Sequence, residues 1–526
     1  MVLSRGRRFL LSACSGVLIG ISFPGDPSLP GFLQEGIGPA AWFCLCPLLL
    51  AAAAARSARE AAVCGLLAGG IGYGAVLYWM APFLIRWGRL SMTESVAVTA
   101  LLVAYVAIYV AGFSACVRVW SARWGAPAAL LLAAPAWTAL EYLRATALTG
   151  FPWCPLGVSQ YRHLTIIQVA DLAGVFGVSF VLVASSALAA LLARRLGGER
   201  FSRMGRATGW TLVLLIAATL AYGWARLMRE PSAGETLRVA LVQANVPQED
   251  RWEATERDEI EAIHVEMTRN AAGAGAQLVV WSESSVPVSM TTHPEFGRRL
   301  ESLASEAGAD MVVGSVAYET RSGRRVPRNS AYLVRPDTGL AGRYDKIHLV
   351  PFGEYVPLHS LLFFLEPLVH EAGDFEPGES VTVLEGRHAS LGVLICYEAT
   401  FPELTRRWVA AGATLLVNMT NDSWYADTAM PRQHLAQSIL RAVESRRFLL
   451  RCAATGISAI ISPSGRITGG AAYGERSLVL GDAAVSRIIT PYAWMGDAVS
   501  IMCVILTALS LLLALRADPL GGTDAL

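Results

Sequence analysis

The sequence predicts a bundle of membrane-spanning α-helices that carries one α/β domain between its last two helices. The 526 residues are 54% hydrophobic and only 16% charged, with a mean hydropathy of +0.44, which is too apolar for an ordinary soluble protein. Long apolar runs fill residues 1–234 and return in residues 488–526, whereas residues 235–487 mix charged and apolar residues in short segments. We therefore expect membrane helices in 1–234, a soluble domain in 235–487, and a last helix with a cytoplasmic tail in 488–526.

A membrane crossing takes about 20 consecutive apolar residues. About eight runs approach that length: Phe9–Phe23, Pro39–Ala55, Ala61–Met80, Val96–Cys116, Ala126–Leu143, Thr165–Leu192, Thr211–Leu227 and Trp494–Leu515. The first run follows several arginines, as a secretion signal does, but no small-residue cleavage site clearly ends it and six more runs follow. We therefore expect it to be a retained helix.

Arginines in the short loops predict the orientation of these helices, because positive loops stay in the cytoplasm. The loops on the side of the N-terminus carry Arg56, Arg59, Arg118, Arg123, Arg194, Arg195, Arg200, Arg203 and Arg206. The opposite short loops carry only Arg86, Arg89, Arg144 and Arg162. Seven crossings then place residues 235–487 outside the cytoplasm, where ATP and NAD are not readily available.

Composition and missing motifs exclude several classes of function. The net charge of +1 offers no electrostatic case for nucleic-acid binding. All nine cysteines except Cys154, Cys396 and Cys452 lie in long apolar runs, which is no disulfide framework. The sequence contains no Walker loop, no zinc-ligand spacing and no G-x-S-x-G motif, so we expect neither a metal nor another cofactor.

Residues 235–487 read as strands that alternate with helices. Strands are predicted at Thr236–Gln243, Gln277–Trp281, Met311–Val316, Ala331–Val334, Ala389–Cys396, Thr414–Asn418 and Ala453–Ile461, and helices at Trp252–Asn270, Pro402–Gly412 and Gln433–Ser445. Apolar strands interleaved with helices predict sheets covered by helices. His264 lies on the first of these helices, and we expect it to be solvated because it lacks a partner at metal-ligand spacing.

One short stretch, G-V-L-I-C-Y-E at Gly392–Glu398, places a cysteine at the end of a buried strand. Open α/β sheets expose reactive groups at that end, and the positive end of the helix predicted at Pro402–Gly412 would favour the thiolate of Cys396. A cysteine at the end of an apolar strand is also commonly a small core residue. The strand pattern alone leaves both interpretations open.

Three further charged residues lie at strand ends or in a loop of the same domain. Glu283 ends W-S-E after a buried strand, where a carboxylate is either a cap or turn residue or a catalytic group. Lys346 and Glu354 lie in Y-D-K-I-H-L-V-P-F-G-E-Y-V-P, a loop that can bury charge only when the charges are paired. For Glu354, an ordinary loop ion pair is an equally good interpretation.

The loop after the fifth apolar run, E-Y-L-R followed by G-F-P-W-C-P-L-G-V-S-Q-Y, is a candidate lipid-binding segment. Phe151 and Trp153 are either interfacial anchors or lipid contacts. Glu141 and Arg144 are costly at membrane depth and, three residues apart on a helix, could pair and line the entrance for a lipid headgroup.

A second candidate lipid-binding segment lies in the soluble domain, where Phe363 and Phe364 occur in H-S-L-L-F-F-L-E-P-L-V at His359–Val369. This segment is either a short buried helix or a membrane-contacting loop that guides acyl chains. We add Trp424 to the candidate lipid contacts.

These motifs resemble a known superfamily. Glu283 in V-V-W-S-E, Lys346 in Y-D-K and Cys396 in G-V-L-I-C-Y-E look like the Glu-Lys-Cys set of the nitrilase, or carbon–nitrogen hydrolase, superfamily. The full lysine loop, N-M-T-N-D-S-W-Y at Asn418–Tyr425, G-F-P-W-x-x-L-G-x-S-Q and the flanking helices are similar to one branch, the bacterial apolipoprotein N-acyltransferases. Ser282, where the superfamily commonly has Pro, and Ile347, where the branch commonly has a polar residue, depart from the pattern.

The resemblance implies an α-β-β-α sandwich on the periplasmic side of a bacterial inner membrane. It implies that the sn-1 acyl chain of a phospholipid forms a thioester on Cys396 and passes to the α-amine of a diacylglyceryl apolipoprotein. Glu283 would then be the general base and Lys346 the group that stabilises the oxyanion. Glu354 would orient Lys346 or assist proton transfer, and we expect Tyr397 and Glu398 to assist as well.

Two alternatives stay open at this point. In a membrane-tethered amidase of the same superfamily, water would take the acyl group, although eight helices are a heavy anchor for such an enzyme. An inactive lipid-binding scaffold would be favoured by the loss of Glu283, Lys346 or Cys396, and all three are present. We expect the protein to act as a monomer in the lipid bilayer.

Overall fold

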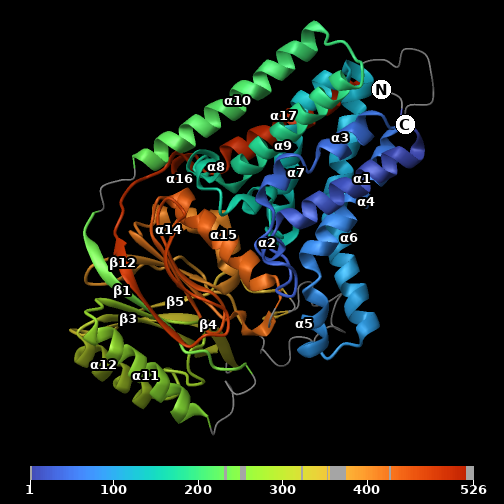
Figure 1. Cartoon of the computed structure of the whole chain (residues 1–526). Helices are drawn as coiled ribbons and strands as arrows, with labels where there is room; N and C mark the ends of the chain where they lie inside the picture. Colours follow the sequence, from blue (N-terminus) through green and yellow to red (C-terminus); the bar gives the residue numbers. More distant parts are fainter. Residues whose placement is uncertain are drawn as a thin grey trace.

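The structure is a computed structural model that describes residues 3–229, 234–248, 256–321, 324–351, 353–355, 375–425 and 428–516. Its helical part packs against a two-sheet domain, and α10 runs along the edge of the bundle towards that domain (Figure 1).

The helical part comprises residues 3–229 and 491–516. Its helices are α1 (Arg5–Ser22), α2 (Gly31–Gln34), η1 (Gly38–Trp42), α3 (Cys46–Ala53), α4 (Ala58–Leu77), α5 (Met80–Arg86), α6 (Met92–Trp124), α7 (Ala126–Thr146), η2 (Ala147–Thr149), η3 (Leu156–Gln160), α8 (Leu164–Ile167), α9 (Ala170–Leu196), α10 (Arg203–Met228), α16 (Pro491–Met495) and α17 (Ala498–Arg516).

Six helices among the described residues are long and apolar enough to cross a membrane: α4, α6, α7, α9, α10 and α17. The sequence predicts about eight, and that count is not confirmed. The first predicted run is α1, which carries three arginines in its first turn. The second run is divided into η1 and α3, since Pro39 and Pro47 each start a new short helix.

Small residues let the membrane helices approach closely. A Cβ atom at Gly65 of α4 would lie 2.4 Å from the Val110 carbonyl oxygen of α6, and one at Gly69 would lie 2.9 Å from Cα of Ala107. Close backbone contact of this kind replaces the hydrophobic effect as the source of attraction between helices in lipid. The bundle thus forms a well-packed support for the attached domain.

The attached domain contains two six-stranded sheets. The first has the order β12-β1-β2-β3-β4-β5 and the second has the order β11-β10-β9-β8-β7-β6. Their strands are β1 (Thr236–Gln243), β2 (Leu278–Trp281), β3 (Asp310–Arg321), β4 (Arg324–Arg335), β5 (Gly339–Asp345), β6 (Leu384–Glu385), β7 (Ser390–Ile395), β8 (Leu415–Thr420), β9 (Leu449–Ala453), β10 (Ser458–Ile461), β11 (Ile467–Ala471) and β12 (Ser477–Ala484). In each sheet three central strands are parallel, β1-β2-β3 and β7-β8-β9.

Helices cover the outer face of each sheet, which gives the expected four layers. Helices α11 (Arg257–Gly273) and α12 (Pro294–Ala307) cover the first sheet on the side away from the bundle, whereas α14 (Pro402–Ala410) and α15 (Met430–Ser445) lie between the second sheet and the membrane helices (Figure 1). Side chains alternate accordingly: Val279 joins the core under α11 and α12, and Val280 joins the core between the sheets.

Two predictions for this domain are wrong. The run Ala453–Ile461 is not one strand but the end of β9, a turn, and β10, which pairs antiparallel with β9. The turn contains Gly456, where a Cβ would lie 2.4 Å from an Asp422 carboxylate oxygen. His264 is not solvated: it is 1% exposed, and its ring lies 4.7 Å from that of Trp281, because it is on the sheet-facing side of α11.

Candidate active site

The candidate catalytic residues follow the carboxyl ends of strands in both sheets. Glu283 follows β2, Lys346 follows β5 and Cys396 follows β7. Since parallel strands of one sheet end at one edge, and the two sheets pack face to face, residues from distant parts of the chain meet there. Glu354 joins them from the short described segment 353–355.

Lys346 lies between two carboxylates in the interior. Its Nζ is 2.9 Å from Oε1 of Glu354 and 3.5 Å from Oε1 of Glu283, and the residue is 1% exposed. Asn329 binds the same two oxygens, since its Nδ2 donates to Glu283 Oε1 at 2.7 Å and to Glu354 Oε1 at 3.0 Å. One ammonium and one amide therefore hold both carboxylates in place.

Backbone amides hold the second oxygen of each carboxylate. The amide N of Asn421 donates to Glu283 Oε2 at 2.8 Å, and that of Val350 donates to Glu354 Oε2 at 2.8 Å. Burial opposes the charge on Lys346, but the Glu354 and Glu283 carboxylates outweigh it and raise the Lys346 pKa above that of an ordinary lysine. The lysine therefore stays an ammonium at neutral pH.

Cys396 has an unusual backbone conformation and a protonated thiol. Its φ of +52° lies in the left-handed region, and the residue is only 8% exposed. Burial raises the pKa of its thiol, and the charge of Glu283 raises it further. α14 begins at Pro402 as predicted, but a 3-10 turn, η6 (Cys396–Thr400), separates it from the cysteine, and burial outweighs the expected stabilisation of the thiolate. The thiol therefore needs a base.

Glu398 connects the cysteine turn to the lysine loop. Its Oε1 accepts hydrogen bonds from the Tyr344 hydroxyl at 2.7 Å and from the amides of Ile347 and His348 at 2.7 and 3.1 Å, and its Oε2 accepts from the Ile395 amide at 2.7 Å. Burial raises the pKa of this carboxyl to about 7. Since it is fully buried and bound to both loops, its position is that of an orienting group.

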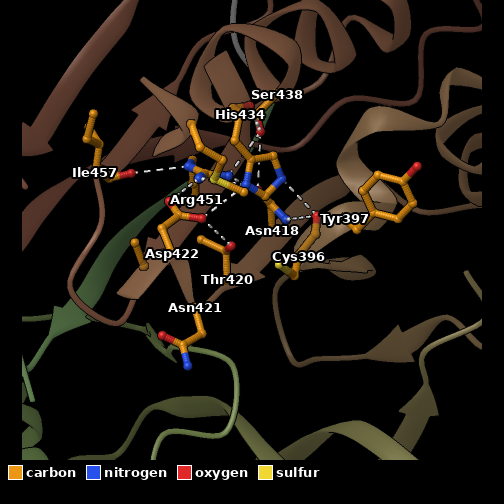
Figure 2. A network of polar contacts seen from close by, with 12 residues as sticks. Cys396, Tyr397, Asn418, Thr420, Asn421, Asp422, His434, Ser438, Arg451 and Ile457 are labelled. Atoms are coloured by element: carbon orange, nitrogen blue, oxygen red, sulfur yellow. Dashed lines mark hydrogen bonds and ion pairs between the residues drawn. The ribbon is translucent and has the colours of Figure 1, made fainter. Parts of the chain in front are cut away.

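A second polar network supports the backbone of the nucleophile (Figure 2). The carbonyl oxygen of Cys396 accepts from His434 Nε2 at 3.0 Å and from Asn418 Nδ2 at 3.5 Å. Asp422 lies behind, with Oδ1 at 3.1 Å from His434 Nδ1 and Oδ2 at 2.7 Å from Nη2 of Arg451. These four supporting side chains are completely buried.

Charge in this network is balanced within the interior. Burial opposes ionisation of Asp422, but the Arg451 guanidinium lowers its pKa to about 2. Burial and the same guanidinium lower the pKa of His434, so its ring is neutral at pH 7 and donates from Nε2. The sequence analysis did not single out His434 or Arg451. Arg451 was the available signal, because an arginine within an apolar strand requires a buried partner of opposite charge.

A cavity of about 480 Å³ opens between the membrane part and this site. Thr149 and Gly150 line it from the loop after α7, and Ile347, Tyr397 and Phe401 line it from the attached domain. The ring of Tyr397 packs edge-on against Phe401, with 5.1 Å between ring centroids, and points away from the network behind Cys396 (Figure 2). Tyr397 is thus a wall of the cavity next to the nucleophile.

The candidate lipid contacts occupy several different environments. Trp153 is 3% exposed and, with Trp79, donates its ring N–H to Oε1 of Gln433 on α15, at 2.9 and 3.1 Å. The Gln433 Nε2 donates to the carbonyls of Pro24 and Val76, both at 3.0 Å. Trp153 therefore joins the two parts of the protein.

Glu141 and Arg144 do not form the expected pair with each other. Glu141 accepts from the amide of Leu156 at 2.7 Å, and Arg144 donates to the carbonyl of Trp153 at 3.0 Å. These bonds hold the loop after α7 in place from inside the bundle. Each residue keeps one buried polar atom without a hydrogen bond in the described structure, Oε2 of Glu141 and Nη2 of Arg144.

The remaining lipid candidates are less buried or are not described. Phe151 is half-buried and packs against the core. Trp424 packs edge-on against Trp87, with 5.0 Å between ring centroids, and its carbonyl accepts from the Trp87 ring N–H at 2.7 Å. Phe363 and Phe364 lie outside the described residues.

Comparisons with known proteins agree with both parts of the architecture. Residues 238–490 match the carbon–nitrogen hydrolase family, and residues 15–188 match the apolipoprotein N-acyltransferase N-terminal domain. An amidase from Nesterenkonia sp. of known structure is 21% identical over 49% of this chain and 95% of its own, with a TM-score of 0.36.

Two relatives match most of the chain. The apolipoprotein N-acyltransferase of Geobacter metallireducens is 38% identical over 512 residues, which cover 97% of this chain and 96% of the relative. That of Methylococcus capsulatus is 34% identical over 457 residues, which cover 84% of this chain and 85% of the relative. The protein is therefore an enzyme of the carbon–nitrogen hydrolase superfamily, and within it the chain belongs to the apolipoprotein N-acyltransferase family.

Proposed function

We propose that this protein transfers an acyl chain from the sn-1 position of a phospholipid to the α-amine of a diacylglyceryl cysteine at the N-terminus of an apolipoprotein. The observation that carries the proposal is the buried cluster of Glu283, Lys346 and Glu354 at the strand ends beside Cys396, next to a cavity walled partly by the membrane loop. A water-facing amidase would need no wall from the bundle.

In the first half-reaction, Glu283 takes the proton of the Cys396 thiol as sulfur attacks the ester carbonyl. The oxyanion forms beside the ammonium of Lys346, which stabilises it electrostatically. When the intermediate collapses, the C–O bond breaks and the lysophospholipid oxygen receives the proton from Glu283. A thioester on Cys396 remains.

In the second half-reaction, the lipoprotein amine attacks the thioester carbonyl and Glu283 takes a proton from its nitrogen. Collapse of this intermediate breaks the C–S bond, forms the amide and returns the proton to sulfur. Neither step requires an added metal or nucleotide. Glu354 holds Lys346, while Glu398 and Tyr397 hold the loops around the acyl group.

The proposal includes the placement of the chain in the cell. Residues 235–487 form the catalytic unit on the periplasmic side of the inner membrane, and residues 1–234 and 488–526 anchor it. The proposed unit is a monomer: all three candidate catalytic side chains come from one chain, so the site needs no second copy.

The test is the intact mass of the purified protein after incubation with a phospholipid whose sn-1 chain is deuterated. We expect a deuterated acyl increment that hydroxylamine removes and that a diacylglyceryl-cysteine peptide accepts as an amide. Cys396→Ser should form no thioester, whereas Cys452→Ser, at another fully buried cysteine, should behave as the wild type.

Two outcomes would contradict the proposal. Acylation of Cys396→Ser at the wild-type rate would exclude Cys396 as the nucleophile. An acyl-enzyme that releases free fatty acid equally fast with and without the peptide would indicate hydrolysis instead of transfer.

A further inference from the structure

A second cavity, of about 370 Å³, lies where α10 meets the catalytic domain. Four arginines line it, Arg226, Arg229, Arg446 and Arg487, together with apolar residues that include Phe448 and Ile488. Arg446 follows the C-terminal end of α15, whereas His434, which binds the Cys396 carbonyl, is near its N-terminal end. Since helical residues rise about 1.5 Å each, the two sites are separated by about 18 Å along α15.

Among the described residues, Asp171 is the one carboxylate paired with the arginines of this cavity. Arg446 binds Oδ2 of Asp171 through Nε at 2.9 Å and Nη2 at 2.7 Å, and Nη2 of Arg226 lies 3.1 Å from the same oxygen. Asp171 is thus shared by two guanidiniums. Within the described residues, Arg229 and Arg487 have no ion pair, and the buried Nε of Arg226 has no hydrogen-bond partner.

An anion would complement this positive charge. Arg229 and Arg487 are exposed at the cavity, so their guanidinium groups are accessible to a ligand. Planar guanidiniums bind phosphate oxygens in bidentate fashion more favourably than they bind single-point acceptors. The chemistry of the cavity therefore suits an oxyanion such as a phosphate group.

The surroundings of the cavity indicate where the phosphate comes from. On α10 the neighbouring Trp224 and Met228 are 64% and 70% exposed, and Ile488, which lines the cavity from the domain, is 39% exposed. Exposed apolar side chains beside a basic pocket, at the end of a membrane helix, are typical of the region where lipid headgroups lie. Acyl chains would lie along α10, because only 17% of the most apolar stretch of this helix is buried in the protein.

We propose that this arginine pocket binds the phosphate of an anionic phospholipid that is not the acyl donor. The bound lipid bridges α10 and the catalytic domain, because Arg226 and Arg229 belong to the helix and Arg446 and Arg487 belong to the domain. The proposal goes beyond the proposed transfer reaction, since it does not depend on chemistry at Cys396.

The test measures lipid retention by native mass spectrometry in a Cys396→Ser background, so that no lipid is consumed. The full-length protein is titrated in detergent with phosphatidylglycerol, with zwitterionic phosphatidylcholine, or with inorganic phosphate. The test variant is Arg229→Gln/Arg487→Gln, which leaves the contacts of Asp171 intact. The matched control is Arg203→Gln/Arg206→Gln, which removes the same charge at the other end of α10.

We expect the background protein and the control to retain one phosphatidylglycerol, and the test variant to bind it at least about tenfold more weakly, because charge-assisted hydrogen bonds are lost. Equal retention by test variant and control would overturn the proposal. Competition by millimolar inorganic phosphate as strong as that by the lipid would identify a free-phosphate site and would also overturn it. Unchanged melting of the lipid-free test variant excludes misfolding as the cause.

Discussion

At the scale of single residues, the nucleophile combines a strained backbone with a thiol that resists ionisation. A left-handed conformation costs a non-glycine residue on the order of 1–2 kcal/mol, and the bonds of His434 and Asn418 to the Cys396 carbonyl hold it. This strain lies at a buried cysteine whose thiol interacts electrostatically with Glu283 and Lys346. The same burial makes a base necessary.

Glu283→Gln should slow thioester formation by about 10²-fold or more, the usual contribution of a general base. The amide keeps the shape of the side chain and can still accept from the Asn421 backbone N–H, so phospholipid binding should be retained. The measurement is the rate of acylation at several lipid concentrations, followed by intact mass. Glu385→Gln, at an exposed glutamate on β6, is the control; a change in binding alone would make Glu283 a structural carboxylate.

The pH dependence of Cys396 alkylation follows from the raised pKa of its thiol. A raised pKa means that the thiolate fraction is small at pH 7 and grows with pH. The rate of alkylation by iodoacetamide should therefore rise about tenfold per pH unit from pH 7 to pH 9, because only the thiolate reacts. A rate that is already constant over this range would show a preformed thiolate.

At the scale of secondary-structure elements, the site depends on β8 and α15 more than on the strand that carries the cysteine. Asn418 lies in β8 and Asp422 follows it, His434 lies in α15, and Arg451 lies in β9. Parallel pairing of β7, β8 and β9 aligns these residues behind Cys396. A buried polar side chain on each neighbouring element fixes how the elements meet.

Asp422→Asn should destabilise the protein by about 3 kcal/mol or more, because it leaves the buried Arg451 charge without its partner. The sign of the pH effect follows from the lowered Asp422 pKa: its stabilisation is present above the unfolded pKa and is lost as pH falls through about 2. The difference between wild type and variant in thermal unfolding should therefore be full at pH 7 and shrink only at strongly acid pH.

Glu306→Gln is the control for this experiment, because it removes one partner of the exposed pair with Arg269. It should leave the melting temperature nearly unchanged, as is usual for surface ion pairs. An equal effect of the two substitutions would mean that the buried network contributes no more than a surface pair.

At the scale of the whole molecule, the bundle and the catalytic domain are joined through Gln433, whose four side-chain hydrogen bonds all reach the bundle. Two uncertain crossings bear on the placement of the domain. Five of the six candidate spans precede it, and adding both α1 and the η1–α3 segment makes seven. We expect these two segments to cross together, which keeps the number odd and puts the domain and the N-terminus on opposite sides of the membrane.

A reporter that is active only in the cytoplasm should therefore be silent when inserted at Gly275, in the exposed turn between α11 and β2. The same reporter fused after Arg516 should be active, because α17 crosses the membrane once more. Reporter activity in living cells is the measurement. The reverse pattern would require an additional crossing among the helices before β1.

The layered fold and the three candidate catalytic residues could be predicted from the sequence because their signals are local. Apolar runs of membrane length, alternation of strands with helices, and a reactive residue at a strand end are each visible within about 20 residues. Reliance on local patterns also explains the errors. Pro39 and Pro47 divide an apolar run that its hydropathy alone predicts to be one helix. Gly456 lies in a turn within a run that alternation alone predicts to be one strand.

The sequence by itself determined the class of the protein, its family resemblance and the residue types available for acyl transfer. Only the tertiary structure decided that Lys346 and Asn329 both bind Glu283 and Glu354. It also decided that His434 and Arg451 support the nucleophile, and that Trp153 joins the two parts of the molecule. It also decided that four arginines from a membrane helix and a distant domain face one cavity. These facts depend on contacts between residues tens to hundreds of positions apart, which strand pairing and helix packing create and which no local pattern records.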